Sequence, residues 1–182
     1  MVSSRVVEDL EVNIFMHRPH LRDIPDVRPL PAGYALRHLD TRDEPALAQL
    51  LSLVFKEPWD ERRVQADLTR AEDVKATYGV FWQRDLVATA SSQLRASHAA
   101  QAGFVHWVAA HPEHRRKRLA ATLVKRVMQD FQERGYESAW LVTQPVRTAA
   151  IRAYLKFGFT PFYDVDGEDH RAYWSGIFQT AF

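Results

Sequence analysis

An apolar run, a basic cluster and an amphipathic stretch follow one another between residues 104 and 133. Residues 104–110 are almost wholly apolar, which is typical of a central strand buried on both faces. From residue 113 to about residue 133 the apolar side chains recur at helical spacing. One stripe of this pattern consists of Leu119, Leu123, Val127 and Phe131. This order predicts a buried strand that leads directly into a long surface helix.

The basic cluster stands where the strand passes into the helix. It consists of Arg115, Arg116, Lys117 and Arg118, with no acidic residue after Glu113. A helix N-terminus already carries partial positive charge and unpaired N–H groups, so acidic residues are normally favoured there. Because like charges destabilise that end unless an anion neutralises them, the sequence predicts a phosphate-binding site.

The overall charge limits the kind of ligand. The chain has 182 residues, with 24 Lys and Arg against 23 Asp and Glu. Nucleic-acid-binding domains are usually basic as a whole, whereas the basic residues here are confined to one turn. We therefore expect a small anionic ligand and no nucleic-acid partner.

Other features of the composition bear on chemistry and location. The chain has no cysteine, which excludes disulfides, thiolate metal sites and cysteine nucleophiles. No cluster of His, Asp or Glu has the spacing of metal ligands, so we expect no metal. No apolar run approaches the ~20 residues of a membrane span, and the acidic N-terminal segment does not resemble a signal peptide. We expect a cytoplasmic protein that does not enter a membrane.

The remaining pattern predicts a single α/β domain. Residues 1–32 are an N-terminal extension, with a short edge strand at residues 12–16 and a proline-rich connector. Residues 33–182 form the domain, in which strands at 76–82 and 86–94 make a hairpin and helices connect other strands. This combination predicts a mixed, mostly antiparallel sheet flanked by helices.

Several residues mark the ends of these elements. Thr41 and Glu44 have the spacing of a capping box and predict a helix start. Gly135 and Gly158 predict the ends of two later helices. A last strand is expected over residues 159–165, followed by a short amphipathic helix.

Two segments resemble the GNAT superfamily of acyl-CoA-dependent N-acetyltransferases. Residues 107–123 read Trp-Val-Ala-Ala-His-Pro-Glu-His-Arg-Arg-Lys-Arg-Leu-Ala-Ala-Thr-Leu, which is similar to the family's cofactor strand and its Arg/Gln-x-x-Gly-x-Gly/Ala pyrophosphate loop. Residues 147–159 read Arg-Thr-Ala-Ala-Ile-Arg-Ala-Tyr-Leu-Lys-Phe-Gly-Phe, which is similar to the family's Asn-x-x-Ala-x-x-x-Tyr-x-x-x-Gly-Phe segment. Both motifs occur in the family's order, with a helix and a strand between them.

The pyrophosphate loop departs from the family pattern at two glycine positions. Arg115 matches the leading Arg/Gln and Ala120 the closing Gly/Ala, but Arg118 and Arg116 stand where glycine is usual. Glycine adopts positive φ and lets the backbone approach a phosphate closely. Arginine loses that freedom but adds a bidentate phosphate-binding fork. We therefore expect the helix N-terminus to bind the pyrophosphate with help from the side chains.

The resemblance implies acetyl-CoA as co-substrate. It also implies that the first strand separates from its neighbour, so that its free backbone groups bond the pantetheine arm. Arg147 replaces the family's Asn and is expected to reach the pantetheine arm or a phosphate, or to cap its helix. The residues expected to bind the cofactor are Val108, Ala109, Ala110, Arg115, Arg116, Lys117, Arg118, Leu119, Ala120 and Arg147.

Tyr154 and His106 are the expected catalytic residues. Tyr154 lies where the family commonly places a tyrosine that protonates the thiolate of the departing CoA, and the alternative is a core tyrosine. A phenol with a pKa near ~10 suits that role. His106 lies on the buried strand and is expected to serve as general base; a core histidine, His111 or a water relay are the alternatives.

The acceptor side is less well defined. Glu57 and Asp60 precede a short helix and either recognise a cationic amine or cap that helix. Phe55 and Trp59 lie in a region that the family often uses for acceptor specificity.

The resulting hypothesis is an N-acetyltransferase. It would transfer an acetyl group from acetyl-CoA to a primary amine of a small molecule or peptide, by direct attack in a ternary complex and without a metal. The alternative is a catalytically degenerate acyl-CoA-binding or regulatory domain, marked by its lost glycines. The acceptor and the oligomeric state, including a homodimer, stay open.

Overall fold

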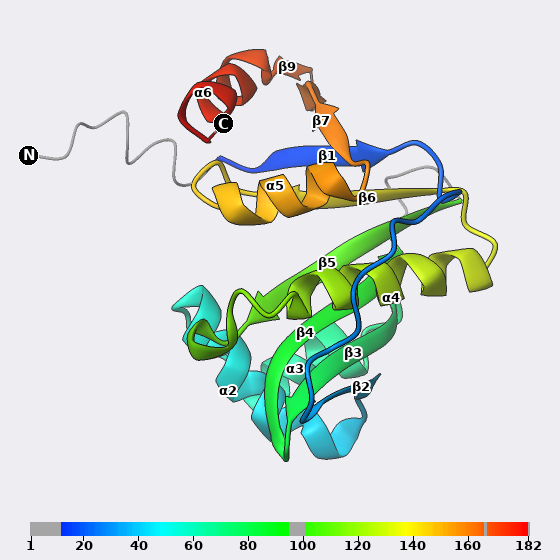
Figure 1. Cartoon of the computed structure of the whole chain (residues 1–182), viewed down its shortest axis with the longest axis vertical. Helices are drawn as coiled ribbons and strands as arrows, with labels where there is room; N and C mark the ends of the chain where they lie inside the picture. The colour runs from blue at the N-terminus through cyan, green and yellow to red at the C-terminus, as the bar shows by residue number, and fades with distance from the viewer. Residues whose placement is uncertain (1–11, 95–100, 166, 182) are drawn as a thin grey trace, which may run out of the picture.

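The computed structural model describes residues 12–94, 101–165 and 167–181, and its elements follow the predicted order (Figure 1). The strands of the main sheet are β1 (Ile14–Arg18), β2 (Tyr34–His38), β3 (Val74–Trp82), β4 (Asp85–Leu94), β5 (Ala102–Ala110), β6 (Ser138–Thr143) and β7 (Thr160–Phe162). The α-helices are α2 (Glu44–Phe55), α3 (Glu61–Val64), α4 (Leu119–Glu133), α5 (Thr148–Lys156) and α6 (Arg171–Ala181).

The main sheet has seven strands in the order β2-β3-β4-β5-β6-β1-β7. Neighbouring strands run antiparallel, except that β5 and β6 are parallel. A separate small hairpin pairs β8 (Asp164–Val165) with β9 (Glu168–Asp169). The predicted mixed, mostly antiparallel sheet flanked by helices is confirmed.

Strand β1 lies inside the sheet and not at its edge. It pairs with β6 on one side, from Ile14 opposite Thr143, and with β7 on the other, from Phe15 opposite Phe162. The predicted edge strand is therefore wrong, because an apolar pattern in the sequence does not tell how many neighbours a strand has. The segment assigned to an N-terminal extension supplies one strand of the sheet.

Helices cover both faces of the sheet (Figure 1). Helix α4 packs on β3, β4 and β5, and its apolar stripe enters the larger core. Helix α2 packs on the other face of β4 and β5. The core beneath α2 and α3 contains Leu39, Leu47, Leu50, Leu51, Trp59, Val64, Leu68, Phe81, Leu86 and Ala109. The two cores hold β5 between them, so its position is fixed from both faces.

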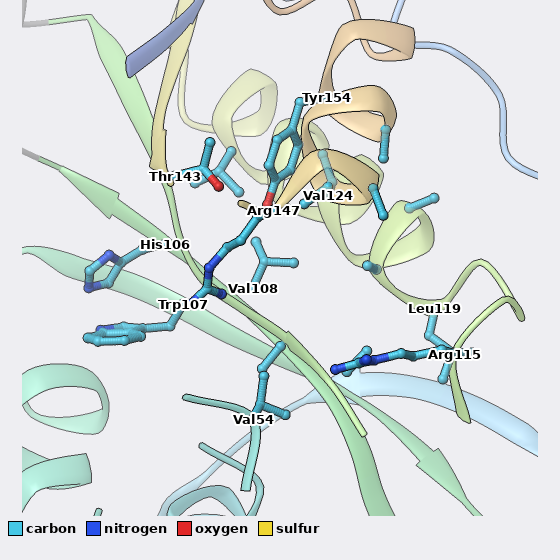
Figure 2. A pocket seen from close by; sticks show the side chains of 18 of the residues that line it. Val54, His106, Trp107, Val108, Arg115, Leu119, Val124, Thr143, Arg147 and Tyr154 are labelled. Atoms are coloured by element: carbon cyan, nitrogen blue, oxygen red, sulfur yellow. The ribbon is translucent and has the colours of Figure 1, made fainter. Parts of the chain in front are cut away.

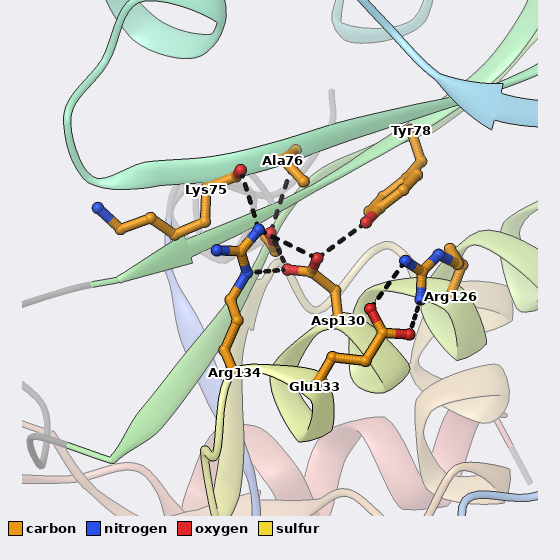
Figure 3. A network of polar contacts seen from close by, with 8 residues as sticks. Lys75, Ala76, Tyr78, Arg126, Asp130, Glu133 and Arg134 are labelled. Atoms are coloured by element: carbon orange, nitrogen blue, oxygen red, sulfur yellow. Dashed lines mark hydrogen bonds and ion pairs between the residues drawn. The ribbon is translucent and has the colours of Figure 1, made fainter.

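A buried carboxylate joins α4 to the sheet (Figure 3). Asp130 accepts hydrogen bonds from the hydroxyls of Tyr78 at 2.8 Å and Ser92 at 2.7 Å, and from Arg134 Nε at 2.7 Å. Burial acts to raise the pKa of Asp130, but these hydrogen bonds outweigh it and hold the pKa below its usual value. Asp130 therefore stays ionised and fixes the C-terminal half of α4 against β3 and β4.

Three element boundaries differ from the predictions. The capping box uses Asp40 and Asp43, one residue before the predicted pair, and the Asp43 carboxylate accepts from Asp40 N–H at 3.0 Å. Helix α4 begins at Leu119, because the short 3₁₀ turn Pro112–His114 and a loop precede it. The predicted last strand is divided at Tyr163 into β7 and β8.

Candidate active site

A cavity of about 1040 Å³ opens beside β5 and β6 (Figure 2). The parallel pairing of these strands ends at Val105 and Leu141, although β5 continues to Ala110 and β6 to Thr143. The backbone of β5 beyond Val105 therefore has no pairing with β6, and its N–H and C=O groups on that side are available to a ligand. The expected separation of the two strands is present.

A bulge in β5 lies at the start of this unpaired stretch. Strand β4 pairs Ser91 with His106 and Thr89 with Ala109, so β5 has one extra residue in the interval. Trp107, within the bulge, has φ 45°, a left-handed conformation that is uncommon for a bulky residue. Its indole ring packs edge-on against Phe55 and Trp59, with ring centroids 5.0 and 4.7 Å apart. The bulge thus joins the cavity wall to the end of α2.

The basic loop forms one end of the cavity. Arg115, Arg116 and Arg118 line it, and within the described residues none of them pairs with a carboxylate. Lys117 does not line the cavity; its Nζ donates to the carbonyl of Glu113 at 3.1 Å. The structure therefore brings three of the four predicted basic residues to the cavity.

Arg116 and Arg118 have a left-handed backbone conformation, which glycine adopts readily and other residues rarely. Their φ angles are 61° and 62°. The expectation that arginine loses this conformation is wrong, although the left-handed region costs an L-residue roughly 1–2 kcal/mol. Backbone strain of this kind persists where surrounding structure holds it in place, often at binding sites.

Helix α4 adds its N-terminus to the same end of the cavity. Arg118 is its N-cap residue and provides no side-chain cap, and its first turn contains no acidic residue. The first N–H groups of a helix have no partner within the helix and favour an anion. Leu119 and Ala120, the first residues of α4, line the cavity as predicted.

Tyr154 lies on α5, where its hydroxyl points into the cavity (Figure 2). Its side chain is only 8% exposed, and the hydroxyl forms no hydrogen bond with the described residues. Burial raises the pKa of Tyr154 to about 12, while the positive charge of Arg147 acts in the opposite direction. The phenol therefore stays protonated throughout the physiological pH range and can donate to a ligand.

Arg147 reaches into the cavity from the start of α5. Its Nε donates to Gln144 Oε1 at 2.6 Å, and its Cζ lies 4.9 Å from the centre of the Phe55 ring. The side chain does not cap α5. Arg147 is the N-cap residue of α5, as one of its predicted roles has it, but only its backbone carbonyl takes part, and the guanidinium lies near Phe55 at the end of α2.

The two candidate bases lie differently. His106 lines the cavity and its ring packs on Trp107, with centroids 5.2 Å apart, but its side chain extends away from the Tyr154 hydroxyl (Figure 2). His111 does not line the cavity, and its Nδ1 accepts from the N–H of Glu113 at 3.3 Å. The structure therefore places His106, and not His111, at the cavity wall.

Comparisons with known proteins identify the fold. The model of the acetyltransferase (GNAT) family matches residues 44–159. The chain belongs to the GNAT acetyltransferase family. Members of this family use acetyl-CoA as co-substrate, which agrees with a cavity that has unpaired cations at one end and a buried phenol further along.

Solved GNAT structures share the architecture. A Novosphingobium aromaticivorans structure described as a GNAT acetyltransferase has 25% identity and a TM-score of 0.63, over 82% of this chain and 59% of its own length. The ribosomal-protein-S18-alanine N-acetyltransferase of Escherichia coli has 21% identity and a TM-score of 0.60, over 70% and 77%. An aminoglycoside acetyltransferase from an uncultured soil metagenomic sample, in complex with sisomicin, has 16% identity and a TM-score of 0.57, over 69% and 87%. No curated protein sequence matches the chain.

The predicted site of this GNAT domain coincides closely with the cavity. The lining contains Tyr154, His106, Val108, Ala109, Ala110, Arg115, Arg116, Arg118, Leu119, Ala120 and Arg147. Phe55 and Glu57 also line it, whereas Trp59 and Asp60 do not. Asp60 is the N-cap of α3, where its side chain accepts from the N–H of Arg63. Of the two acidic residues considered for the acceptor side, only Glu57 faces the cavity.

Several lining residues were not predicted. They include Asn13, Val54, His114, Val142, Thr143, Gln144 and Lys156. His114 immediately precedes the basic cluster in the sequence. Its Nδ1 lies 2.8 Å from the Tyr34 hydroxyl, and this contact joins residues far apart in the sequence. Burial, followed by the charges of Lys117 and His111, lowers the pKa of His114. Only the three-dimensional fold brings these residues to the same cavity.

Metal-binding clusters and membrane-spanning helices are not found in the described segments. No group of three His, Asp or Glu side chains in the described segments is arranged to hold a metal ion. None of the helices in the same segments is long and apolar enough to cross a membrane.

Proposed function

We propose that the chain transfers an acetyl group from acetyl-CoA to a primary amine of a small molecule or peptide, by direct attack on the thioester in a ternary complex. One observation carries this proposal. A single cavity joins Arg115, Arg116 and Arg118, which have no carboxylate partner among the described residues, to the hydroxyl of the largely buried Tyr154. Anion-binding groups at one end and a proton donor further along suit a long cofactor with phosphates remote from its reactive end.

The residues at the basic end fit a pyrophosphate. Arg115, Arg116 and Arg118 line this end of the cavity, beside the first turn of α4 with its free N–H groups. The backbone at Arg116 and Arg118 is left-handed, a conformation that is typical of glycine. Lys117 adds charge from outside the cavity lining.

The unpaired part of β5 fits the pantetheine arm. Val108, Ala109 and Ala110 line the cavity beyond the last residue pair with β6. Two alanines leave room for a chain to approach the strand edge, so the amides of the arm can bond to the β5 backbone as an added strand would.

Tyr154 supplies the acid. Acetyl-CoA contributes an acyl thioester whose leaving group is a thiolate. With a pKa raised to about 12 by burial, the Tyr154 phenol remains protonated and donates a hydrogen bond and then a proton toward that sulfur. Arg147 lowers the pKa of the phenol in turn, which makes proton donation easier.

His106 accepts the proton of the attacking amine through water. Its ring extends away from the Tyr154 hydroxyl, so a relay fits the geometry better than direct contact (Figure 2). The cytoplasmic location, the lack of a nucleic-acid partner and a homodimer stay predictions of the sequence.

The experiment is an acetyl-transfer assay on the purified protein with acetyl-CoA and a panel of primary amines. Release of free CoA thiol, together with detection of the acetylated amine by mass spectrometry, supports the proposal. Acetyl-CoA binding without transfer to any amine would favour the degenerate regulatory domain. Absence of both binding and transfer would refute the proposal.

A further inference from the structure

The cavity lining is strongly unbalanced in charge. Five cationic side chains face it: Arg115, Arg116, Arg118, Arg147 and Lys156. Among the described lining residues, Glu57 is the one carboxylate. It is already engaged, since its Oε1 lies 3.3 Å from both Trp59 Nε1 and Arg63 Nη2. A ligand with several positive charges would therefore meet repulsion and little compensation.

Arg147 belongs to a different part of the cavity from the basic loop. Its guanidinium lies against Phe55, whose ring in turn packs on Trp107. Figure 2 shows Arg147 entering from α5 beside Val108 and Trp107, whereas Arg115 enters from the loop before α4. Once the three loop arginines hold cofactor phosphates, Arg147 is left facing the space where the acceptor must reach the thioester.

No carboxylate among the described residues neutralises the charge of Arg147. Apart from the neutral Gln144 oxygen, no described residue accepts a hydrogen bond from its guanidinium. An ionised carboxylate is purely an acceptor, so it can pair with the guanidinium N–H groups of Arg147 that Gln144 leaves free.

We propose that the acceptor is a small amine that also carries a carboxylate, as an amino acid does, and that Arg147 binds that carboxylate. This inference rests on the proposed acetyl transfer and gives its acceptor class. It assigns Arg147 to the acceptor and not to the cofactor. A planar guanidinium held by Gln144 and stacked near Phe55 is preorganised for two parallel hydrogen bonds to a carboxylate.

The test compares matched acceptors with and without the carboxylate. The pairs are phenylalanine with 2-phenylethylamine and histidine with histamine, and spermidine is the polycationic probe. We expect kcat/KM to be at least ~10-fold higher for the acid of each pair, which corresponds to one charge-assisted hydrogen-bonded contact. Spermidine should be the poorest acceptor. Equal rates within both pairs, or preference for spermidine, would overturn the inference.

Two variants test whether Arg147 causes the preference for acceptors that carry a carboxylate. Arg147→Gln should reduce the ratio of kcat/KM within each pair toward one, mainly by raising KM for the acid. Arg152→Gln removes an exposed positive charge from the same helix, outside the cavity lining, and should keep the ratio. If Arg147→Gln instead weakens acetyl-CoA affinity and keeps the ratio, Arg147 serves the cofactor and the inference is wrong. Circular dichroism of each variant checks that it is folded.

The outcome also separates this inference from the proposed function. Acetylation of amines without preference for an acid contradicts the acceptor class and leaves the acetyltransferase proposal in place. A protein that binds no acetyl-CoA contradicts the acetyltransferase proposal and the inference with it.

Discussion

Arg116 and Arg118, two residues apart in the loop before α4, hold the same left-handed backbone conformation, with φ angles of 61° and 62°. Both residues are exposed, both line the cavity, and neither pairs with a carboxylate among the described residues. The loop thus has the backbone course of a glycine-rich phosphate loop and the charge of an arginine cluster. The lost glycines do not by themselves mark a closed site.

Arg118→Gly should stabilise the protein and weaken cofactor binding at the same time. Removing Cβ relieves the strain of the left-handed backbone, whereas glycine increases the conformational entropy of the unfolded chain. We expect the first effect to exceed the second by about 0.5–1 kcal/mol. Losing the guanidinium should raise the dissociation constant of acetyl-CoA about 5- to 20-fold. Thermal unfolding and calorimetric titration measure the two effects. Arg118→Ala is the control: it should lose the same affinity without the gain in stability.

Tyr154→Phe should lower turnover and keep acetyl-CoA affinity nearly intact. The substitution removes only the hydroxyl, and positioned acids contribute about 10²- to 10⁴-fold to such reactions. We expect kcat to fall by about 10²-fold, measured by release of CoA thiol. Unchanged turnover would remove Tyr154 from the mechanism and leave it as a core residue.

Asp130→Asn should destabilise the fold by about 2–3 kcal/mol, because it weakens several charge-assisted hydrogen bonds to a buried group. Chemical denaturation at neutral pH measures this. Asp26→Asn, which removes a carboxylate from the largely exposed ion pair with Lys125, should change stability far less. Equal effects of the two substitutions would contradict the structural role of the Asp130 network.

The same network predicts how stability depends on pH. The pKa of Asp130 is lowered in the folded protein, so its contribution is fully present above the unfolded-state pKa of about 3.9. It is lost as the pH falls through the lowered folded-state value. The difference in unfolding free energy between the wild type and Asp130→Asn should therefore be constant from neutral pH to about pH 5 and shrink in stronger acid. A difference that grew on acidification would contradict the lowered pKa.

Gly103→Ala should destabilise the protein by about 1–3 kcal/mol through overpacking. Gly103 lies on β5, where an added Cβ would overlap the ring of Phe131 on α4. Gly176→Ala on α6 is the matched control, since an added Cβ there meets no atom within 4 Å. The control should be neutral or slightly stabilising, because alanine favours the helix. Thermal unfolding of both variants distinguishes packing from a general effect of removing glycine.

Local motifs explain what the sequence could predict. The apolar run of β5, the stripe of α4 and the register of Tyr154 on α5 are set by short-range periodicity, and each appears in the structure where it was expected. The predicted position of the capping box was wrong by one residue. Two overlapping pairs, Asp40 with Asp43 and Thr41 with Glu44, both fit the spacing.

Long-range contacts explain what the sequence could not predict. The position of β1 between β6 and β7 depends on pairing with residues far along the chain. The bulge at Trp107 depends on register with β4, and the contact of Arg147 with Phe55 joins α5 to α2 across the cavity. No local pattern encodes these relationships, yet they decide which side chains face the cavity.

Calorimetric titration with acetyl-CoA, with dephospho-CoA and adenosine as controls, measures whether the cavity binds the cofactor through its pyrophosphate. The cavity, its arginines and the N-terminus of α4 predict micromolar binding of acetyl-CoA and of dephospho-CoA, which retains the pyrophosphate, and none of adenosine. Absence of binding at millimolar acetyl-CoA would mean that Arg116 and Arg118 close the site, and would contradict a pyrophosphate-binding role for this cavity.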